Sequence, residues 1–335
     1  MINVITVSDI KKLIQQIGLH HFFQLLMNEI EQSYLRWNEF EKSPRHATHV
    51  PNGVIELMPI CDAKYYAFKY VNGHPINASR NKLTVVAVGL LADAMNGYPL
   101  LLSEMTVLTA LRTAATSALA AKYLAKKSSK IVGIIGTGAQ SEFQILAQHA
   151  LFHLKSVRYF DTDSAAMKKF EKNLKDQPFD LIACKNGESV LEACDIVTTA
   201  TAAKSQTKIL NNEWIHDGLH INGIGGDCPG KTELDKAILS RAKVVVEYFP
   251  QSKIEGEIQQ NNASFYAELW EIISRKKLGR ENDQEITLFD SVGFAIEDYA
   301  ALKLIYELSE KYKMGKKMDL IPELGNVKNL FEVLC

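Results

Sequence analysis

The feature that most constrains this chain is a glycine-rich turn between an apolar strand and a helix. Residues 131–135 read IVGII and lead directly into Gly136-Thr137-Gly138-Ala139-Gln140-Ser141. A glycine at the first position permits a tight turn, and a glycine at the second lets a phosphate group approach the backbone. The following helix would present N–H groups and positive partial charge to that phosphate. The turn predicts a parallel α/β sheet with a dinucleotide site.

An acidic residue stands where such a site needs one. Asp161 ends the strand-like segment VRYFD, 25 residues after Gly136 (161 − 136 = 25). Its carboxylate could accept hydrogen bonds from a ribose hydroxyl, and it would repel a 2′-phosphate, which favours NAD over NADP. Arg158 and Lys168 lie nearby and leave that choice open. The alternative is a glycine turn in an α/β sheet that binds no nucleotide.

The two ends of the chain differ from its middle in the pattern of residue types and in the secondary structure that this pattern predicts. Residues 46–104 are rich in β-branched and aromatic residues and contain Asn96-Gly97, a strong hairpin signal, so we expect a mostly antiparallel sheet there. Helices are expected after Ser8, as an N-cap, over 106–125 with Thr106 as its cap, and after residue 294. Between them, strand-like runs alternate with helical ones, which indicates a parallel sheet covered on both faces.

The expected fold class is therefore α/β. A Rossmann-type doubly wound parallel sheet should occupy residues 129–293. Residues 1–128 and 294–335 should together form a second, α+β domain for substrate binding and dimerisation.

Composition excludes several classes of protein. With 38 basic and 39 acidic residues the net charge is −1, so binding of nucleic acid through bulk charge is not expected. The most apolar run, LTVVAVGLLADAM, is too short to span a membrane, and the first residues lack the apolar core of a signal peptide. Five scattered cysteines without a CxxC spacing argue against a disulfide framework or a metal site. We expect a cytoplasmic protein whose partners are small molecules or other protein chains.

Several charged residues stand in apolar surroundings. Lys69 lies between aromatic residues in YYAFKYV, Arg112 in the apolar helix TALRTAAT, and Arg45 in SPRHATH. Each could be surface charge or a snorkelling side chain. Together they could bind a substrate carboxylate, for which arginine has a suitable geometry. Glu56 in GVIELMP is either a solvated carboxylate or a partner for an ammonium group.

Asp227 is the sharpest candidate for acid–base chemistry. It lies in GIGGDCPGKTE, a glycine-rich loop after the strand-like LHING. Ligands of doubly wound sheets bind beyond the carboxyl ends of the strands, where this loop would lie. A carboxylate there could exchange a proton with an amine as it becomes an imine; a turn-forming Asp is the alternative. Lys231 either contacts the cofactor or begins the next helix.

Several segments together resemble a known family. KSPRHATH, GVIELMP, YAFKYVNGHP, GTGAQSEFQ, NGIGGDCPGKTEL, IEGEIQQ and FDSVGFAIEDY closely resemble the ornithine cyclodeaminase/mu-crystallin family. The resemblance covers nearly the whole chain. It implies conversion of L-ornithine to L-proline and ammonia with NAD, by oxidation to an imine, cyclisation and re-reduction. It also implies a homodimer built through the N-terminal sheet.

The resemblance also implies roles for individual residues. Lys69 and Asp227 would be catalytic, and the substrate would contact Arg45, Glu56, Lys69, Arg112, Asp227 and Val292. The NAD-contacting positions would be Thr84, Arg112, Gly136, Gly138, Ala139, Gln140, Asp161, Thr201, Asn222, Gly223, Ile224, Lys231 and Ser291.

Three alternatives remain open at this point. A ketimine reductase or an amino-acid dehydrogenase acting on alanine would use the same dinucleotide turn and cations but would turn over NADH stoichiometrically. Lysine is longer than ornithine by one methylene, which is worth only about 1–3 kcal/mol of discrimination. A nucleotide-binding protein without catalysis, like the lens crystallin members of the family, would not need Lys69 and Asp227.

Overall fold

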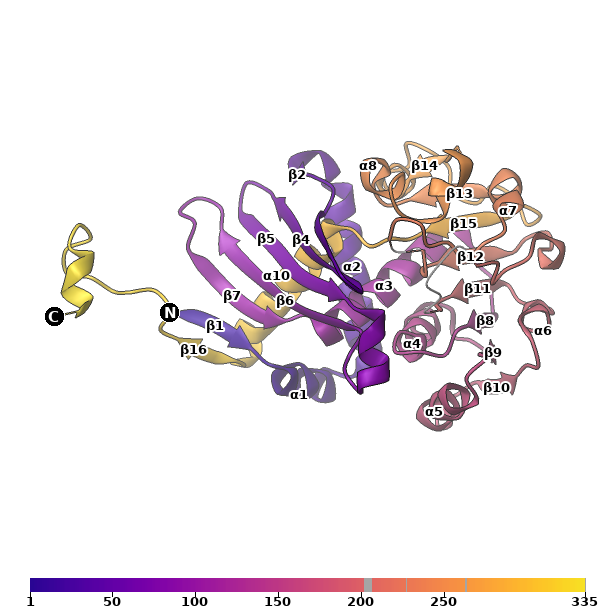
Figure 1. The fold of residues 1–335 in the computed structure, drawn as a ribbon, viewed down its shortest axis with the longest axis horizontal. Coiled ribbons are helices and arrows are strands. Elements are labelled where there is room, and N and C mark those ends of the chain that lie inside the picture. The colour runs from indigo at the N-terminus through magenta and orange to yellow at the C-terminus, as the bar shows by residue number, and fades with distance from the viewer. Residues whose placement is uncertain (202–206, 227, 263, 335) are drawn as a thin grey trace.

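The computed structural model describes residues 1–201, 207–226, 228–262 and 264–334, which form two lobes (Figure 1). One lobe combines the beginning and the end of the chain, and the middle of the chain forms the other. In these described ranges, no helix is long and apolar enough to cross a membrane.

The first lobe is built on an eight-stranded sheet in the order β16-β1-β7-β6-β5-β4-β2, with β3 also paired to β4. Its pairs are antiparallel except for β1 and β7, which run parallel. Gly97, at φ +77°, turns the chain from β6 to β7 as the Asn-Gly signal predicts. The antiparallel sheet expected over 46–104 is confirmed. The strands are β1 (Ile2–Ile5), β2 (Glu41–Lys42), β3 (His46–Val50), β4 (Gly53–Cys61), β5 (Tyr65–Gly73), β6 (Val85–Asp93), β7 (Pro99–Glu104) and β16 (Lys316–Met318).

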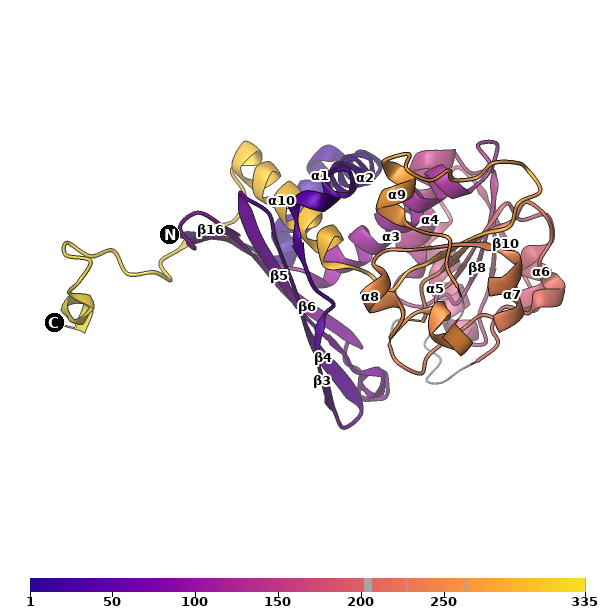
Figure 2. The same cartoon turned by 90° about the horizontal axis from the view of Figure 1, so that it is seen from above.

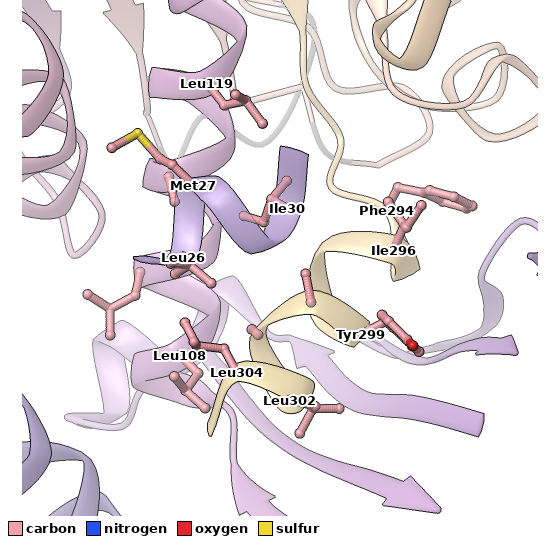
Figure 3. Close-up of a cluster of buried hydrophobic side chains, with 14 of the residues drawn as sticks. Leu26, Met27, Ile30, Leu108, Leu119, Phe294, Ile296, Tyr299, Leu302 and Leu304 are labelled. Carbon is pink, nitrogen blue, oxygen red and sulfur yellow. The ribbon is translucent and has the colours of Figure 1, made fainter. Parts of the chain in front are cut away.

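Helices cover one face of this sheet only. Figure 2 shows α1 (Val7–Ile17), α2 (Leu19–Leu35) and α10 (Ala295–Tyr312) on the same side, with the opposite face bare. Leucine, isoleucine and aromatic side chains of α2, α3 (Thr106–Leu124) and α10 fill the space between helices and sheet (Figure 3). The hydrophobic core of this lobe therefore forms between chain segments nearly 300 residues apart.

Two helix caps differ from the expectation. The side chain of Thr6, not Ser8, accepts the Asp9 N–H, and the Asp9 carboxylate accepts the Thr6 N–H at 2.9 Å, so α1 begins at Val7. Thr106 is not the cap of α3. The Glu104 carboxylate accepts the first N–H groups of that helix, and Thr106 Oγ1 instead accepts the Ala87 N–H.

The second lobe is a parallel sheet in the order β10-β9-β8-β11-β12-β15-β13-β14. The strand order reverses at β8, which pairs with β9 on one side and β11 on the other. This is the topological switch point where ligands of doubly wound sheets bind, and the expected Rossmann-type sheet is confirmed. The strands are β8 (Ile131–Ile135), β9 (Ser156–Phe160), β10 (Asp180–Ala183), β11 (Ile196–Thr199), β12 (His220–Gly223), β13 (Lys243–Val246), β14 (Ala267–Glu268) and β15 (Thr287–Asp290).

Short helices connect these strands. They are α4 (Ser141–Phe152), α5 (Ser164–Leu174), α6 (Gly187–Leu191), α7 (Lys236–Arg241), α8 (Phe249–Ser252) and α9 (Leu269–Ile273), with the 3₁₀ turns η3 (Asn212–Trp214) and η4 (Glu257–Asn262). Three further 3₁₀ turns lie outside the parallel sheet, namely η1 (Trp37–Glu39), η2 (Pro75–Arg80) and η5 (Leu330–Leu334). β15 is the last strand of the parallel sheet along the chain, and the chain passes from it straight into α10 of the other lobe.

Candidate active site

The turn between β8 and α4 has the backbone that a phosphate-binding loop requires. Gly136 has φ +98°, and a Cβ there would lie 2.5 Å from the Ala200 carbonyl oxygen. A Cβ on Gly138 would meet no atom within 4 Å, so the space above this residue is open. Ser141 occupies the third position of the motif, fully buried, and its hydroxyl donates to the Gly138 carbonyl at 2.8 Å. A serine thus closes the loop where glycine is usual.

Asp161 lies beside this loop. Its Oδ2 accepts the Thr137 N–H at 2.6 Å and the Thr137 hydroxyl at 3.1 Å. The Arg158 guanidinium, one of the two cations that left NADP open, donates to the Ser189 carbonyl and to Glu192 instead. Lys168 is exposed on α5. The Asp161 carboxylate therefore lies against the loop, whereas Arg158 and Lys168 do not contact it in the hydrogen bonds described.

A cavity of about 530 Å³ opens next to the loop. It is lined by residues of the loop, α4 and α5, including Thr137, Gly138, Ala139, Glu142, Phe143 and Lys169. Lys169 donates to the Gly138 carbonyl at 3.0 Å and to the Glu142 carboxylate at 2.9 Å. Lys169 and Glu142 therefore both line the cavity and hold the loop beside it.

Other residues proposed to contact the cofactor end the neighbouring strands. Ile224 N–H bonds to the Thr199 carbonyl, and Ser291 N–H bonds to the Gly223 carbonyl, so β11, β12 and β15 end side by side. Thr201 donates its N–H and hydroxyl to Glu233. Asn222 is fully buried, and its Nδ2 has no hydrogen-bond partner in the described part of the chain. The Gln140 Oε1 atom is a second buried polar atom of this kind.

These residues fit a dinucleotide. Gly138 leaves room for a pyrophosphate, α4 directs its N-terminus at that room, and Asp161 borders it. Buried polar atoms without a partner cost free energy unless a ligand or water satisfies them, and Asn222 and Gln140 supply two along the same edge. Within the described ranges, no group of three or more His, Cys, Asp or Glu side chains could hold a metal ion.

The cations of the other lobe are buried and paired, not exposed. Lys69 is 1% exposed, because it points from β5 toward the helices while Phe68 and Tyr70 point away, as the alternation predicts. Its Nζ donates to Asp298 Oδ1 at 2.8 Å. Burial, together with the nearby Arg112 charge, lowers the pKa of Lys69 to about 8. The surface interpretation of this lysine is wrong.

Arg112 shares the same carboxylate. Its Nε donates to Asp298 Oδ1 at 3.0 Å and its Nη1 to Glu297 Oε2 at 2.6 Å. Arg112 is 4% exposed, so it does not snorkel to solvent. Burial raises the pKa of Glu297, and the Arg112 charge works in the opposite direction.

Arg45 joins the two lobes. Its Nη1 pairs with Glu56 Oε2 at 3.1 Å and its Nε lies 3.3 Å from Glu255. Its Nη2 donates to the carbonyl oxygens of Val292 and Gly293 at 2.6 and 2.7 Å. An added Cβ on Gly293 would lie 2.6 Å from Arg112 Nη1, so the same loop contacts both arginines. The structure thus brings together Arg45, Glu56, Lys69, Arg112 and Val292.

Three of the expected residues need separate description. Asp227 lies outside the described residues. Thr84 precedes β6, where its carbonyl accepts the His74 N–H, and no contact among the described residues connects it to the phosphate loop. Lys231 N–H bonds to the Cys228 carbonyl in a turn, short of α7, which begins at Lys236. The roles of all three in binding stay predictions.

Sequence reasoning missed the acidic partners of the cations. Glu297 and Asp298 open α10, and two acids in a first helical turn have an ordinary explanation in the helix dipole. Glu247, fully buried, follows β13. The available signal was the position of Glu247 directly after VVV, at the carboxyl end of a buried parallel strand.

Comparison with known proteins identifies the family. Residues 7–313 match the model of the ornithine cyclodeaminase/mu-crystallin family. Ornithine cyclodeaminase of Agrobacterium tumefaciens is 47% identical over 98% of this chain and 93% of its own. A lysine cyclodeaminase structure superposes with a TM-score of 0.92 at 27% identity, over 98% of both chains. An archaeal alanine dehydrogenase dimer with bound NAD gives 0.88 at 33% identity, over 96% of this chain and 99% of that one. The chain belongs to the ornithine cyclodeaminase/mu-crystallin family.

Proposed function

We propose that this protein is an ornithine cyclodeaminase, which converts L-ornithine to L-proline and ammonia with NAD as a recycled cofactor. Ornithine equals proline plus ammonia atom for atom, so the overall reaction needs no net oxidant. The observation that carries the proposal is the cluster of Arg45, Lys69, Arg112 and Glu56 around the 292–293 loop, at the end of β15. The similarity to curated ornithine cyclodeaminases along nearly the whole chain supports it.

NAD, when bound, supplies the acceptor and later the donor of a hydride at the substrate α-carbon. Gly136, Gly138, Ala139 and Gln140 would hold its pyrophosphate, and Asp161 its adenosine ribose. The groups that end β11, β12 and β15, from Thr201 to Ser291, would hold the nicotinamide end beside Val292.

The chain's own residues orient the substrate. Arg45, Lys69 and Arg112 are the cations available to its carboxylate. Glu56, 6% exposed, would receive one ammonium group. Asp227 is proposed as the group that takes up and returns the proton of the reacting amine. The buried position of the cluster excludes water, which limits hydrolysis of an imine.

The balance of charge favours a diamino acid over alanine. Each cation already contacts at least one buried carboxylate, from Glu56, Glu255, Glu297 or Asp298. Burying a ligand carboxylate together with two ammonium groups suits such an acid-rich site, whereas alanine brings only one ammonium. An alanine dehydrogenase or ketimine reductase remains the alternative, supported by the alanine dehydrogenase structure.

One assay separates these activities. Purified protein with catalytic NAD is incubated with ornithine, lysine or alanine, and proline, ammonia and absorbance of NADH are followed. We expect proline and ammonia in equal amounts from ornithine, with no lasting rise in NADH. Stoichiometric NADH from alanine, with no proline from ornithine, would replace the proposal by the alternative.

We also propose that two chains associate through the bare face of the sheet in the first lobe. Large apolar side chains are exposed across its central strands, namely Leu57, Tyr66, Tyr70, Val86 and Val88. Leu57 and Val88 are the direct neighbours of Tyr70 on either side, so the patch is continuous. Exposed apolar patches of this kind mark association sites.

We add proposals for the domain limits and for the cellular location. We propose domain limits at 128/129 and 293/294, which the strand content of the two sheets supports. We also propose that the protein works in the cytoplasm, in agreement with the free thiols of Cys61, Cys184 and Cys194.

A further inference from the structure

The segment that connects the two lobes is held by one buried carboxylate. Residues 291–294 join β15 to α10 without regular secondary structure, and the first three of them are held most closely. Glu247 is fully buried beside them and accepts three hydrogen bonds from three consecutive residues. Its Oε1 accepts the Ser291 hydroxyl at 2.6 Å and the Gly293 N–H at 3.0 Å, and its Oε2 accepts the Val292 N–H at 3.0 Å.

The parallel sheet explains why Glu247 reaches this segment. Val246, the last residue of β13, pairs with Asp290, the last residue of β15. The next residue of each strand, Glu247 and Ser291, therefore lies at the same edge, just beyond the carboxyl ends of the strands. From this position the Glu247 carboxylate reaches the connecting segment.

The opposite side of the segment contacts the proposed substrate cations. The carbonyl oxygens of Val292 and Gly293 accept both donations of Arg45 Nη2, and the Gly293 carbonyl also accepts Gln251 Nε2 at 2.8 Å. Gly293 adopts φ +78° and lies against the Arg112 guanidinium, without room for a Cβ. N–H groups on one side and carbonyl groups on the other thus fix the segment between Glu247 and the arginines.

We infer that Glu247 is a positioning residue for substrate binding, which sets the segment 291–293 and, through it, the guanidinium of Arg45. The inference rests on the proposed function, because it takes Arg45 as a ligand of the substrate carboxylate. Glu247 itself contacts neither substrate nor cofactor in this scheme. Its effect reaches the substrate through the Val292 and Gly293 carbonyl groups.

Glutamine is the informative replacement because it keeps the size of the side chain. A carboxylate offers two acceptor oxygens to the three donors, whereas an amide offers one oxygen and an NH₂ group. Each Glu247 oxygen accepts one backbone N–H group, so in Glu247→Gln the NH₂ group must face the N–H of either Val292 or Gly293. A buried donor facing a donor is unfavourable, so the segment should shift.

The test compares E247Q, R45Q and the double variant with the wild-type holoenzyme. We expect E247Q to raise the KM for ornithine at least tenfold and the Kd for NAD by a smaller factor, because Ser291 is the one residue of the segment among the proposed NAD contacts. Because Glu247 would act through Arg45, the double variant should lose no more kcat/KM than the worse single variant. E247D, which keeps two acceptor oxygens on a shorter stem, should lie between wild type and E247Q.

Asp62→Asn is the matched control. Asp62 is also a buried carboxylate that accepts two backbone N–H groups, those of Lys64 and Tyr65, and the Tyr299 hydroxyl, and in addition it pairs with Arg36. Its replacement should lower the Tm and leave both the KM and the Kd for NAD unchanged. A general loss of packing would affect E247D, which leaves a cavity, more than E247Q, and that order would overturn the inference.

A crystal structure of E247Q tests the positioning role without any measurement on the substrate. The Arg45 Nη2 to Val292 O distance, now 2.6 Å, should exceed 3.5 Å. An unchanged segment and an unchanged Arg45 would overturn the positioning role. Failure of the wild type to convert ornithine would instead refute the proposed function. The wild-type assay and the E247Q structure therefore test the function and the positioning role separately.

Discussion

Lys69 is a buried cation whose charge depends on two neighbours of opposite sign. Desolvation and the Arg112 charge lower its pKa to about 8, while the Asp298 carboxylate works against both. A lysine with this pKa changes its charge within the range in which the enzyme can be assayed. Its role as a ligand of the substrate carboxylate can therefore be tested through pH.

We predict that kcat/KM for ornithine falls as the pH rises through about 8. The cationic form of Lys69 binds the carboxylate, and its fraction decreases about tenfold for each pH unit above the pKa. In Asp298→Asn the raising influence of the carboxylate is lost, so the inflection should move to lower pH. The amino groups of ornithine titrate identically with both proteins, which makes the shift between them specific to the enzyme. An activity that increases through pH 8 would instead make Lys69 a base.

At the scale of an element, the β8–α4 turn depends on two glycines for different reasons. Gly136 needs its positive φ and has the Ala200 carbonyl in the place of a Cβ. Gly138 has neither a positive φ nor a neighbour within 4 Å of a Cβ. The first glycine is required by the fold, and the second only by a ligand.

The matched pair Gly136→Ala and Gly138→Ala separates these roles. Gly136→Ala should lower the free energy of unfolding by about 1–3 kcal/mol, because the added Cβ forces the backbone to shift. Gly138→Ala should leave the urea unfolding midpoint unchanged and weaken NAD binding at least tenfold, because the Cβ occupies the space of the pyrophosphate. Urea titration and calorimetric NAD binding measure the two effects. If Gly138→Ala and the wild type bind NAD with equal affinity, the pyrophosphate does not bind at this loop.

Local patterns predicted the elements well and their contacts poorly. The β8–α4 turn, the 46–104 sheet and the helices were readable because periodicity and turn chemistry are local properties. We expected Thr106 as the cap of α3, whereas the cap is Glu104. Glu104 belongs to the preceding strand, where a carboxylate is ordinarily interpreted as a surface residue. Capping from a neighbouring element carries no local signature.

At the scale of the whole molecule, hydrogen bonds between the segments GGDCPGKTEL and IEGEIQQ explain why the two sequence motifs occur together. Glu257 of IEGEIQQ accepts the N–H groups of Glu233 and Leu234 in the GGDCPGKTEL segment, and Gln259 donates to the Cys228 and Lys231 carbonyls. Burial and the Asp290 charge raise the pKa of Glu257 to about 8. The two motifs hold one loop, the one that carries Asp227. Nothing in either segment alone shows that the other is its partner.

The same argument applies to the proposed substrate site. Arg45, Lys69 and Arg112 could be selected from the sequence as cations in apolar surroundings. The partners of Lys69 and Arg112, Glu297 and Asp298, lie 185 or more residues further along the chain. Only the return of the chain from the parallel sheet through α10 brings them together. The residue types can therefore be recognised in the sequence, whereas their ion pairing depends on the complete fold.

The bare sheet face gives the last prediction. A surface whose central strands expose Leu57, Tyr70 and Val88 side by side is unfavourable in water, and a second copy of the same face would cover it with the two-fold symmetry usual for dimers. Val88→Lys, on a strand fully paired on both sides, should leave the chain folded. In a dimer it would bury two like charges across the interface, which costs several kcal/mol.

Light scattering coupled to size-exclusion chromatography measures the outcome. The wild type should elute with twice the mass of one chain, and Val88→Lys should elute as a single chain with the circular dichroism of the wild type. The control is Ile182→Lys on β10, an equally exposed isoleucine at the edge of the parallel sheet, which should remain dimeric. If Val88→Lys stays dimeric, the two chains meet elsewhere. In that event the apolar face would still require a partner, because α1, α2 and α10 lie on the other side (Figure 2).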